Sequence, residues 1–142
     1  MIIGLIVGVF DLYHPGHVIT LQECKNHCDK LILGINVGIN FDITINPGKR
    51  KPVYSLDERI LILDSVKYID ELFTYNSEVE LLDYLKTIKP DIRFLGDDYR
   101  GKRVTGEEFS SNIHFINRSH GYSTTSVLER INKNTLDDKI FE

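Results

Sequence analysis

GVFDLYHPGH, residues 8–17, joins an apolar run, residues 2–9, to a predicted helix that begins at Pro15. Proline suits the first turn of a helix, where its missing N–H removes no hydrogen bond. His14 and His17 therefore lie beside the free backbone N–H groups at the positive end of the helix dipole. A helix start of this kind is a natural binding site for phosphate groups.

Apolar runs and helical patterns alternate along the whole chain. This alternation is typical of a parallel β-sheet covered by helices. Several of the runs are β-branched and apolar on both faces, as buried parallel strands require. The sequence therefore predicts an α/β domain of three layers with a five-stranded parallel sheet, whose strands occupy residues 2–9, 30–37, 71–74, 92–95 and 113–116.

Four helices are predicted from their start signals, the first being the one described above. Ser55 and Ser77 are each followed three residues later by a glutamate, the spacing of a capping box, and begin the second and third helices. The last helix follows Ser123. Residues 1–132 are expected to form a single domain, and residues 133–142 a polar, frayed tail.

The composition argues against several classes of protein. A net charge of −4 lacks the basic field that a general nucleic-acid binder carries. The apolar run 2–10 is too short to cross a bilayer and lacks the flanks of a targeting signal. Cys24 and Cys28 lie one helical turn apart, where a disulfide would be strained, and so indicate a reducing cytoplasm. A metal site on them and His27 is disfavoured, because the chain has no second ligand pair of zinc-finger spacing.

Two long irregular segments, residues 38–54 and 96–106, interrupt the alternation. Loops of this length in a compact domain are usually functional. Ligands of open α/β sheets bind beyond the carboxyl ends of the strands, so both loops should lie over one site. Lys49, Arg50 and Lys51 place a cationic cluster in the first loop, where it can neutralise phosphate charge.

Three signatures resemble those of the cytidylyltransferase-like nucleotidyltransferases. HPGH, residues 14–17, matches the HxGH signature of that family. GDDYRGK, residues 96–102, is similar to the loop after its fourth strand, and RSHGYSTT, residues 118–125, resembles its C-terminal signature. Within the family the chain looks most like the glycerol-3-phosphate cytidylyltransferases, which implies a Rossmann-like nucleotidyltransferase fold for the domain of residues 1–132.

The resemblance also implies a reaction. It is the transfer of CMP from CTP to a small phosphorylated alcohol, here glycerol 3-phosphate, with release of pyrophosphate. The acceptor already carries a phosphate oxygen that can attack the α-phosphorus in line, so catalysis is positioning and electrostatic stabilisation. The expected cofactor is Mg²⁺ bound with the triphosphate. A homodimer is expected, with neither nucleic acid nor membrane as a partner.

The site residues are assigned from the motifs and the resemblance together. His14 and His17 are expected to donate hydrogen bonds in the transition state, and Lys51 and Arg118 complete the expected catalytic set. Lys51 and Arg59 are expected to bind the acceptor phosphate, because the resembling enzymes carry basic residues at these points. The residues expected to bind the nucleotide lie in the signatures: Val9, Phe10, Asp11, Gly16, Asp97, Arg118, Ser123, Thr124 and Thr125.

Physical arguments support parts of this set. Gly16 has no side chain at a point where a phosphate must come close to the backbone. Ser123 is a suitable N-cap for the last helix, and Thr124 and Thr125 add hydroxyls and backbone donors beside it. Asp11 is either a structural or a magnesium-linked carboxylate, and the metal ligands stay unassigned. The interpretation requires the two imidazole rings and the Ser-Thr-Thr turn on the same side of the sheet.

Three other functions stay open. KPV at residues 51–53, followed by LDER at residues 56–59, also resembles the heptose-phosphate adenylyltransferases, which use ATP. Val9 stands where glycerol-3-phosphate enzymes often have threonine, whereas Arg118 and the 97–99 loop are closer to the cytidylyltransferase pattern. Adenylyl transfer to a cofactor precursor fits the C-terminal signature less well. A non-catalytic nucleotide-binding regulator would keep the same phosphate site, because fold alone does not fix function.

Overall fold

The computed structural model describes residues 1–38 and 51–140, with side chains up to residue 136. In this part of the chain five parallel strands form one sheet in the order β3-β2-β1-β4-β5. The predicted five-stranded parallel sheet is confirmed. Each strand begins and ends within one residue of its predicted bounds: β1 (Ile3–Gly8), β2 (Lys30–Asn36), β3 (Glu71–Tyr75), β4 (Ile92–Gly96) and β5 (Asn112–Ile116).

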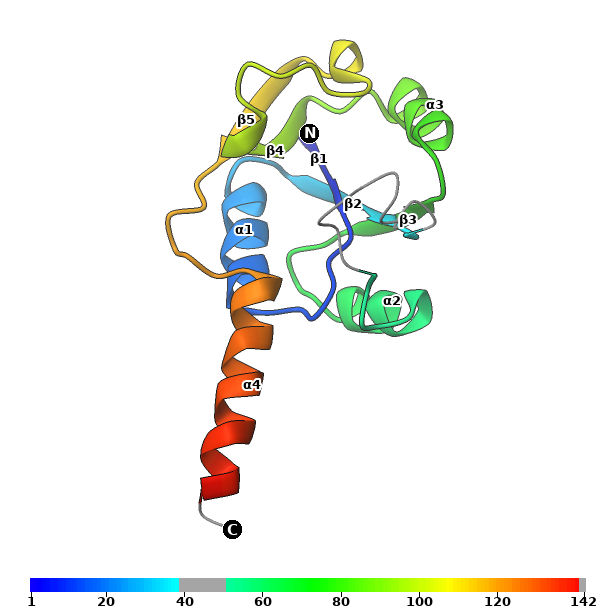
Figure 1. The fold of residues 1–142 in the computed structure, drawn as a ribbon. Helices are drawn as coiled ribbons and strands as arrows, with labels where there is room; N and C mark the ends of the chain where they lie inside the picture. The colour runs from blue at the N-terminus through cyan, green and yellow to red at the C-terminus, as the bar shows by residue number, and fades with distance from the viewer. Residues whose placement is uncertain (39–50, 141–142) are drawn as a thin grey trace.

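Helices cover both faces of the sheet, which gives the three predicted layers (Figure 1). The helices α1 (Pro15–Asn26) and α2 (Leu56–Asp64) pack on one face, and α3 (Glu78–Ile88) packs on the other. Successive residues of a strand point to opposite faces, so Ile6 of β1 lies in the first core cluster and Leu5 in the second. Both faces of β1 are therefore buried, as its continuous apolar run predicts.

Serine caps begin the second and third helices as predicted. The Ser55 Oγ accepts from the Glu58 N–H at 3.2 Å, and the Glu58 carboxylate accepts from the Ser55 N–H at 2.9 Å, which completes a capping box. Ser77 accepts from the Glu80 N–H, but the Glu80 carboxylate turns to the N–H of Asn76. Such caps typically stabilise a helix by about 1 kcal/mol.

The last helix, α4 (Thr124–Ile140), continues past residue 132, where the sequence was expected to leave the helix for a frayed tail. That expectation is wrong, because residues 133–140 contain no glycine or proline to end the helix. The helix projects from the body of the protein in Figure 1, and its residues 129–136 are exposed. It crosses the expected domain boundary at residue 132, and that boundary stays a prediction.

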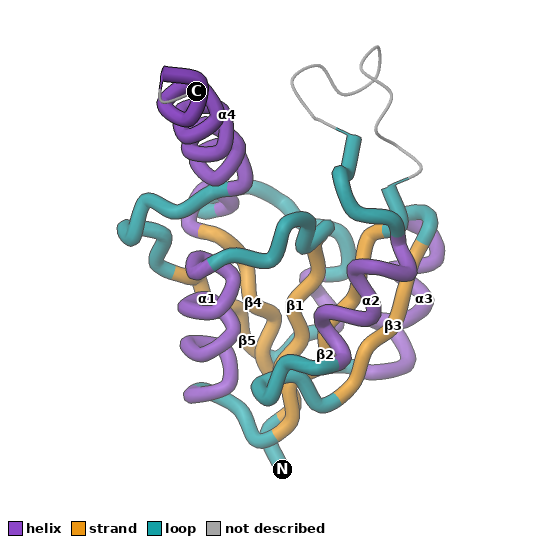
Figure 2. The backbone as a smooth tube through the Cα atoms, turned by 90° about the horizontal axis from the view of Figure 1, so that it is seen from below, coloured by secondary structure: helices purple, strands orange, loops and turns teal. Residues whose placement is uncertain are grey.

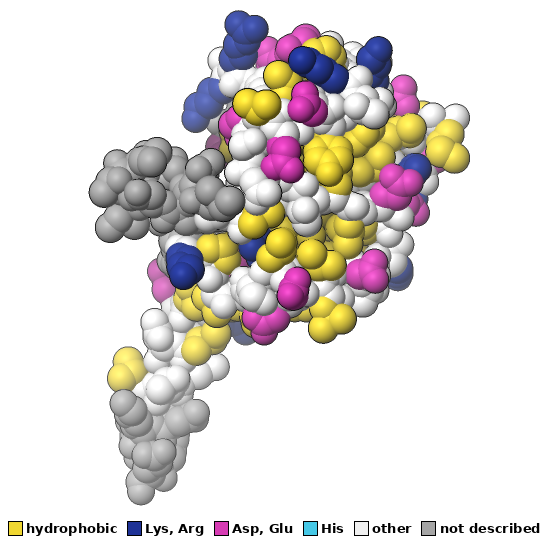
Figure 3. All heavy atoms as spheres, turned by 90° about the vertical axis from the view of Figure 1, so that its right-hand side faces the viewer, with side chains coloured by type: hydrophobic (Ala, Val, Ile, Leu, Met, Phe, Trp, Pro, Cys, Tyr) yellow, Lys and Arg dark blue, Asp and Glu magenta, His cyan; other side chains and the backbone are white. Residues whose placement is uncertain are grey.

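The surface carries charges of both signs. On the face shown in Figure 3, acidic side chains are spread among apolar ones, and Lys and Arg gather mainly near its upper edge. This mixture agrees with a sequence that has 17 Lys and Arg against 21 Asp and Glu. Within residues 1–38 and 51–140, none of the helices has both the length and the apolar character of a membrane span.

The sheet topology determines where a ligand can bind. The chain runs from β1 outward to β2 and β3, and then crosses back to place β4 on the other side of β1. The carboxyl ends of β1 and β4 therefore flank a topological switch point, where the connections diverge and leave a crevice. Figure 2 shows the loops that follow these strands gathered at one end of the sheet, together with the start of α4.

Candidate active site

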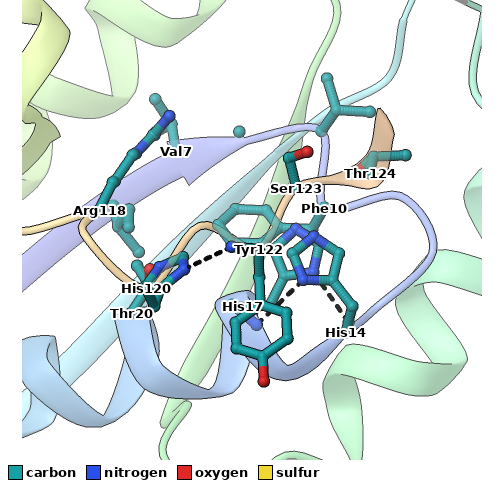
Figure 4. A pocket seen from close by; sticks show the side chains of 14 residues that line it. Val7, Phe10, His14, His17, Thr20, Arg118, His120, Tyr122, Ser123 and Thr124 are labelled. Carbon is teal, nitrogen blue, oxygen red and sulfur yellow. Dashed lines mark hydrogen bonds between the residues drawn. The ribbon is translucent and has the colours of Figure 1, made fainter. Parts of the chain in front are cut away.

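A cavity of about 260 Å³ lies at the carboxyl end of β1, on the side covered by α1. The loop after β1, the start of α1 and the turn before α4 line it, so segments from both ends of the chain meet there (Figure 4). This is the place where open α/β sheets bind ligands. The predicted site residues that line the cavity are Val9, Phe10, His14, Gly16, His17, Arg118, Ser123 and Thr124.

His14 and His17 are held in place by the start of α1. His14 is the N-cap, and its Nδ1 accepts from the Gly16 N–H at 3.0 Å, while Nδ1 of His17 accepts from the His14 N–H at 3.1 Å (Figure 4). The two ring centroids lie 3.8 Å apart. Because each Nδ1 is an acceptor, a neutral ring carries its proton on Nε2. Each ring therefore has its Nε2–H left as a donor for a ligand.

The surroundings favour the neutral form of both imidazoles. Burial, followed by the nearby His14 and Arg118, lowers the pKa of His17 to about 3, against the opposing effect of the Asp11 carboxylate. Burial and then His120 lower the pKa of His14. Near neutral pH the rings can become cationic when bound phosphates raise these pKa values. In the free protein at neutral pH they are neutral hydrogen-bond donors.

We expect the free energy of unfolding to fall as the pH is lowered from 6.5 toward about 3, because the unfolded chain protonates His17 in this window and the folded protein does not. Above pH 6.5 the ring is neutral in both states and the contribution is constant. Urea unfolding from about pH 5 to pH 6.5, above the range of ordinary carboxylates, measures the slope. The change of unfolding free energy with pH should be smaller in His17→Gln than in the wild type. Equal changes in the two proteins would show that His17 titrates normally in the folded state.

The Ser-Thr-Thr turn lies over the start of α1. Ser123 and Ser126 cap α4 reciprocally, since each backbone N–H donates to the other residue's Oγ at 3.0 Å. A Cβ added to Gly16 would lie 2.8 Å from the Tyr122 Cβ, so this glycine lets the turn pack against α1. The amino ends of α1 and α4 therefore meet at one cavity. The two imidazole rings and the Ser-Thr-Thr turn therefore lie on the same side of the sheet, as the sequence interpretation requires.

Arg118 reaches over the carboxyl end of β4. Its Nη1 lies 3.9 Å from the Asp98 Oδ1. Gly96 makes room for the guanidinium, because an added Cβ there would lie 2.8 Å from the Arg118 Cζ. Asp97, which was expected to bind the nucleotide, instead pairs through Oδ1 with the Arg100 Nε at 3.0 Å and does not line the cavity. The carboxylate beside Arg118 is therefore that of Asp98.

Asp11 holds the backbone that leads into α2. Its Oδ2 accepts from the Val53 N–H at 2.7 Å, and its Oδ1 accepts from the Tyr54 N–H at 2.9 Å. The residue is 7% exposed. Both carboxylate oxygens are thus engaged by the protein, and the expected role of Asp11 in nucleotide binding stays a prediction. Of the two roles considered for this carboxylate, the structural one fits its placement.

Arg59 ties together the carboxyl ends of β1 and β2. Its Nη1 donates to the carbonyls of Val9 at 3.1 Å and Asn36 at 2.7 Å, and its Nη2 donates to the carbonyl of Val37 at 3.0 Å. The residue is 2% exposed. Burial lowers the pKa of Arg59, and Asp11 opposes this shift. The guanidinium is enclosed, and its Nη1 and Nη2 donate to backbone carbonyls, whereas its Nε has no hydrogen-bond partner among the described residues. This placement favours a structural role, and the expected contact between Arg59 and an acceptor phosphate stays a prediction.

Two other predicted residues lie outside the cavity. Lys51 and Thr125 are exposed, and neither lines it. Lys49 and Arg50 fall outside the described residues. The roles assigned to Lys51 in catalysis and acceptor binding, and to Thr125 in nucleotide binding, stay predictions.

The family model described as cytidylyltransferase-like matches residues 5–130. The chain belongs to the cytidylyltransferase-like family. The resemblance drawn from the three signatures is thereby confirmed, and with it the class of nucleotidyltransferase.

Curated relatives in this family are longer proteins. The bifunctional protein HldE of Helicobacter pylori (strain ATCC 700392 / 26695) is 35% identical over 133 residues, and that of Aliarcobacter butzleri (strain RM4018) is 33% identical over 127 residues. The matches cover 92% and 89% of this chain, but only 28% and 26% of the relatives. The chain therefore spans about a quarter of the length of these relatives.

Solved structures share the fold. The lipopolysaccharide core biosynthesis protein from Thermoplasma volcanium gives a TM-score of 0.64 at 24% identity, over 82% of this chain and 98% of that one. The pantothenate synthetase from Thermus thermophilus gives 0.54 at 12% identity, over 82% and 55%. At these identities the likeness shows the fold alone, and it agrees with the Rossmann-like nucleotidyltransferase fold that was predicted.

The cavity beside His14 and His17 is also lined by residues that the sequence analysis did not assign to the site. Thr20, His120 and Tyr122 line it (Figure 4). Thr20 follows His17 by one helical turn, so helical spacing could have identified it. His120 and Tyr122 stand inside the RSHGYSTT signature, where the His120 Nδ1 accepts from the Tyr122 N–H at 3.0 Å. Their position within that signature was the available signal.

Magnesium has no ligand set among the described residues. They contain no group of three or more His, Cys, Asp or Glu that could hold a metal ion. The residues lining the cavity include no carboxylate, the ligand that Mg²⁺ prefers. The carboxylate of Asp11 already accepts two backbone N–H groups. The described residues therefore contain no cluster of metal ligands, and the expected Mg²⁺ bound with the triphosphate stays a prediction.

A second cavity, of about 460 Å³, opens on the α3 side of β1. Residues 6–9 and Arg118 line both cavities, so the two meet around the carboxyl end of β1. A transferase needs its two substrates in adjacent sites. The pair of cavities provides that arrangement.

Proposed function

We propose that this chain transfers AMP from ATP to the phosphate of a small sugar phosphate, such as a heptose phosphate, and releases pyrophosphate. The observation that carries the proposal is the pair His14 and His17 at a cavity where the amino ends of α1 and α4 meet. Helix N-termini and preorganised N–H donors attract phosphate oxygens. The first cavity therefore suits the triphosphate.

The similarity to the HldE proteins favours ATP and a heptose phosphate over CTP and glycerol 3-phosphate. Those relatives are named bifunctional, and the chain matches 28% and 26% of their length, so we infer that the matching region carries one of two functions. Residues 51–53 and 56–59 resemble the heptose-phosphate adenylyltransferases as well. Cytidylyl transfer to glycerol 3-phosphate is the second candidate, because Arg118 beside Asp98 follows the cytidylyltransferase pattern.

The proposed step needs no covalent enzyme intermediate. A phosphate oxygen of the acceptor forms a bond to the α-phosphorus, and the bond from that phosphorus to the oxygen leading to the β-phosphate breaks. The electron pair leaves with pyrophosphate, so donors to the phosphate oxygens stabilise the transition state. His14, His17 and Arg118 supply these donors. Mg²⁺ would accompany the triphosphate, and no step depends on a protein ligand to it.

The test is a panel of ATP and CTP against heptose, glycerol, ethanolamine and choline phosphates, read by pyrophosphate release and product mass. We expect release with ATP and heptose phosphate, and an ADP-sugar product. Turnover with CTP and glycerol 3-phosphate alone would contradict the adenylyl proposal and support the second candidate. Nucleotide binding without pyrophosphate release in every pairing would favour the non-catalytic regulator.

A further inference from the structure

Arg93 is a buried cation in the second cavity. It lies on β4 beside Leu5 of β1, so its side chain leaves the sheet on the α3 side. The residue is 1% exposed and lines the cavity. Its Nη1 donates to the Thr105 carbonyl at 2.9 Å, and its Nε has no hydrogen-bond partner among the described residues. A buried charge is stable only when it is paired and hydrogen-bonded, so this arrangement is incomplete.

The side chains around Arg93 do not provide an ion-pair partner for its guanidinium. Burial lowers the pKa of Arg93. The opposing effect comes from three residues that line the same cavity and favour the charged guanidinium: Tyr75, Glu78 and Tyr99. No carboxylate lies within ion-pair distance of Arg93 among the described residues. Arginine does not lose its proton in proteins, so the guanidinium stays charged. An anionic ligand in the cavity would supply the missing partner.

Arg103 and Arg118 line the same cavity, and both are exposed. Three guanidinium groups around one space suit a phosphate, which arginine binds through paired N–H donors. Asn36 and Glu78 add polar groups that can hydrogen-bond to sugar hydroxyls. A volume of about 460 Å³ is within the range of small-molecule sites.

We infer that Arg93 and Arg103 bind the phosphate of the acceptor in the second cavity, an inference that rests on the proposed function. Arg118, which lines both cavities, then lies between this phosphate and the nucleotide. The pair takes the role that the sequence assigned to Arg59. Three positive charges also offset the repulsion between the acceptor phosphate and the triphosphate, which must approach each other for transfer.

The test measures binding of inorganic phosphate by calorimetry, with α,β-methylene ATP present to occupy the first cavity. Arg103→Gln and Arg93→Lys should each raise the phosphate Kd by about tenfold or more, the scale of one charge-assisted hydrogen bond. The matched control is Lys102→Gln, which removes an exposed charge next to Arg103 but outside the cavity, and should bind like the wild type. Arg103→Gln carries the test if Arg93→Lys does not fold.

Turnover provides a second measurement. In Arg103→Gln the KM for the acceptor should rise about tenfold while the KM for the nucleotide stays unchanged. Phosphate binding in both arginine variants as tight as in Lys102→Gln would overturn the inference. Phosphate binding that depends on both arginines, without pyrophosphate release from any substrate pair, would overturn the proposed function and support the anion site.

Discussion

Replacing His17 with glutamine is expected to lower kcat roughly a hundredfold to a thousandfold, the usual effect of removing one preorganised donor to a developing charge. The imidazole Nε2–H is lost, whereas the glutamine oxygen can still accept from the His14 N–H, as a glutamine at this helix position does in a capping box. The fold should therefore survive. Pyrophosphate release at saturating substrates, together with thermal unfolding, measures the two effects separately.

His27→Gln is the matched control, because it makes the same change at the other end of α1, where His27 is the exposed C-cap. It should leave kcat unchanged. His17→Ala should lose the same activity and, in addition, about 1 kcal/mol of stability, because the acceptor for the His14 N–H is gone. A kcat for His17→Gln equal to that of the wild type would remove His17 from the catalytic set.

The sheet was predictable because its signal is local. Buried parallel strands need continuous apolar runs, and each strand lies within one residue of its run. Helix starts were predictable for the same reason, since a serine and a glutamate three residues later are read directly from the chain. The end of α4 was not, because the residues after 132 are polar but contain nothing that stops a helix.

The candidate site divides in the same way. His14, His17 and Ser123 hold positions at helix starts, which their neighbours in sequence determine, and the structure brings them to one cavity. Asp11 and Arg59 depend instead on contacts with residues 42 and 50 positions away, which no local pattern encodes. From sequence alone, an arginine in the first turn of a helix could bind a phosphate or could donate hydrogen bonds to the backbone of neighbouring strands.

Arg93 was not assigned to the site from the sequence, although it lines the second cavity. It stands in IRFLG, a predicted buried strand, where a charged residue is unusual. The exception is visible in the sequence itself, where Arg93 interrupts the apolar run of residues 92–95. A charged residue inside an apolar strand is a useful signal, since burial forces it to find a partner in the protein or in a ligand.

Replacing Arg59 with methionine is expected to destabilise the protein by about 3 kcal/mol or more. Methionine can occupy much of the same space, but the carbonyls of Val9, Asn36 and Val37 would lose their donor. A buried polar group left without a partner costs about 1–3 kcal/mol, and a whole domain is stable by only about 5–15 kcal/mol. Urea unfolding at pH 7 measures the loss as a shift in midpoint.

The same variant distinguishes a structural role of Arg59, in which it links β1 and β2, from a role in binding the acceptor phosphate. If Arg59 serves the fold, unfolding shifts, and the exposed control Arg130→Met stays within about 0.5 kcal/mol of the wild type. If Arg59 instead binds the acceptor phosphate, Arg59→Met keeps its unfolding midpoint and raises the KM for the acceptor. That second pattern would contradict the structural role. It would also weaken the assignment of Arg93 and Arg103, because the acceptor phosphate would then be bound by a residue outside the second cavity.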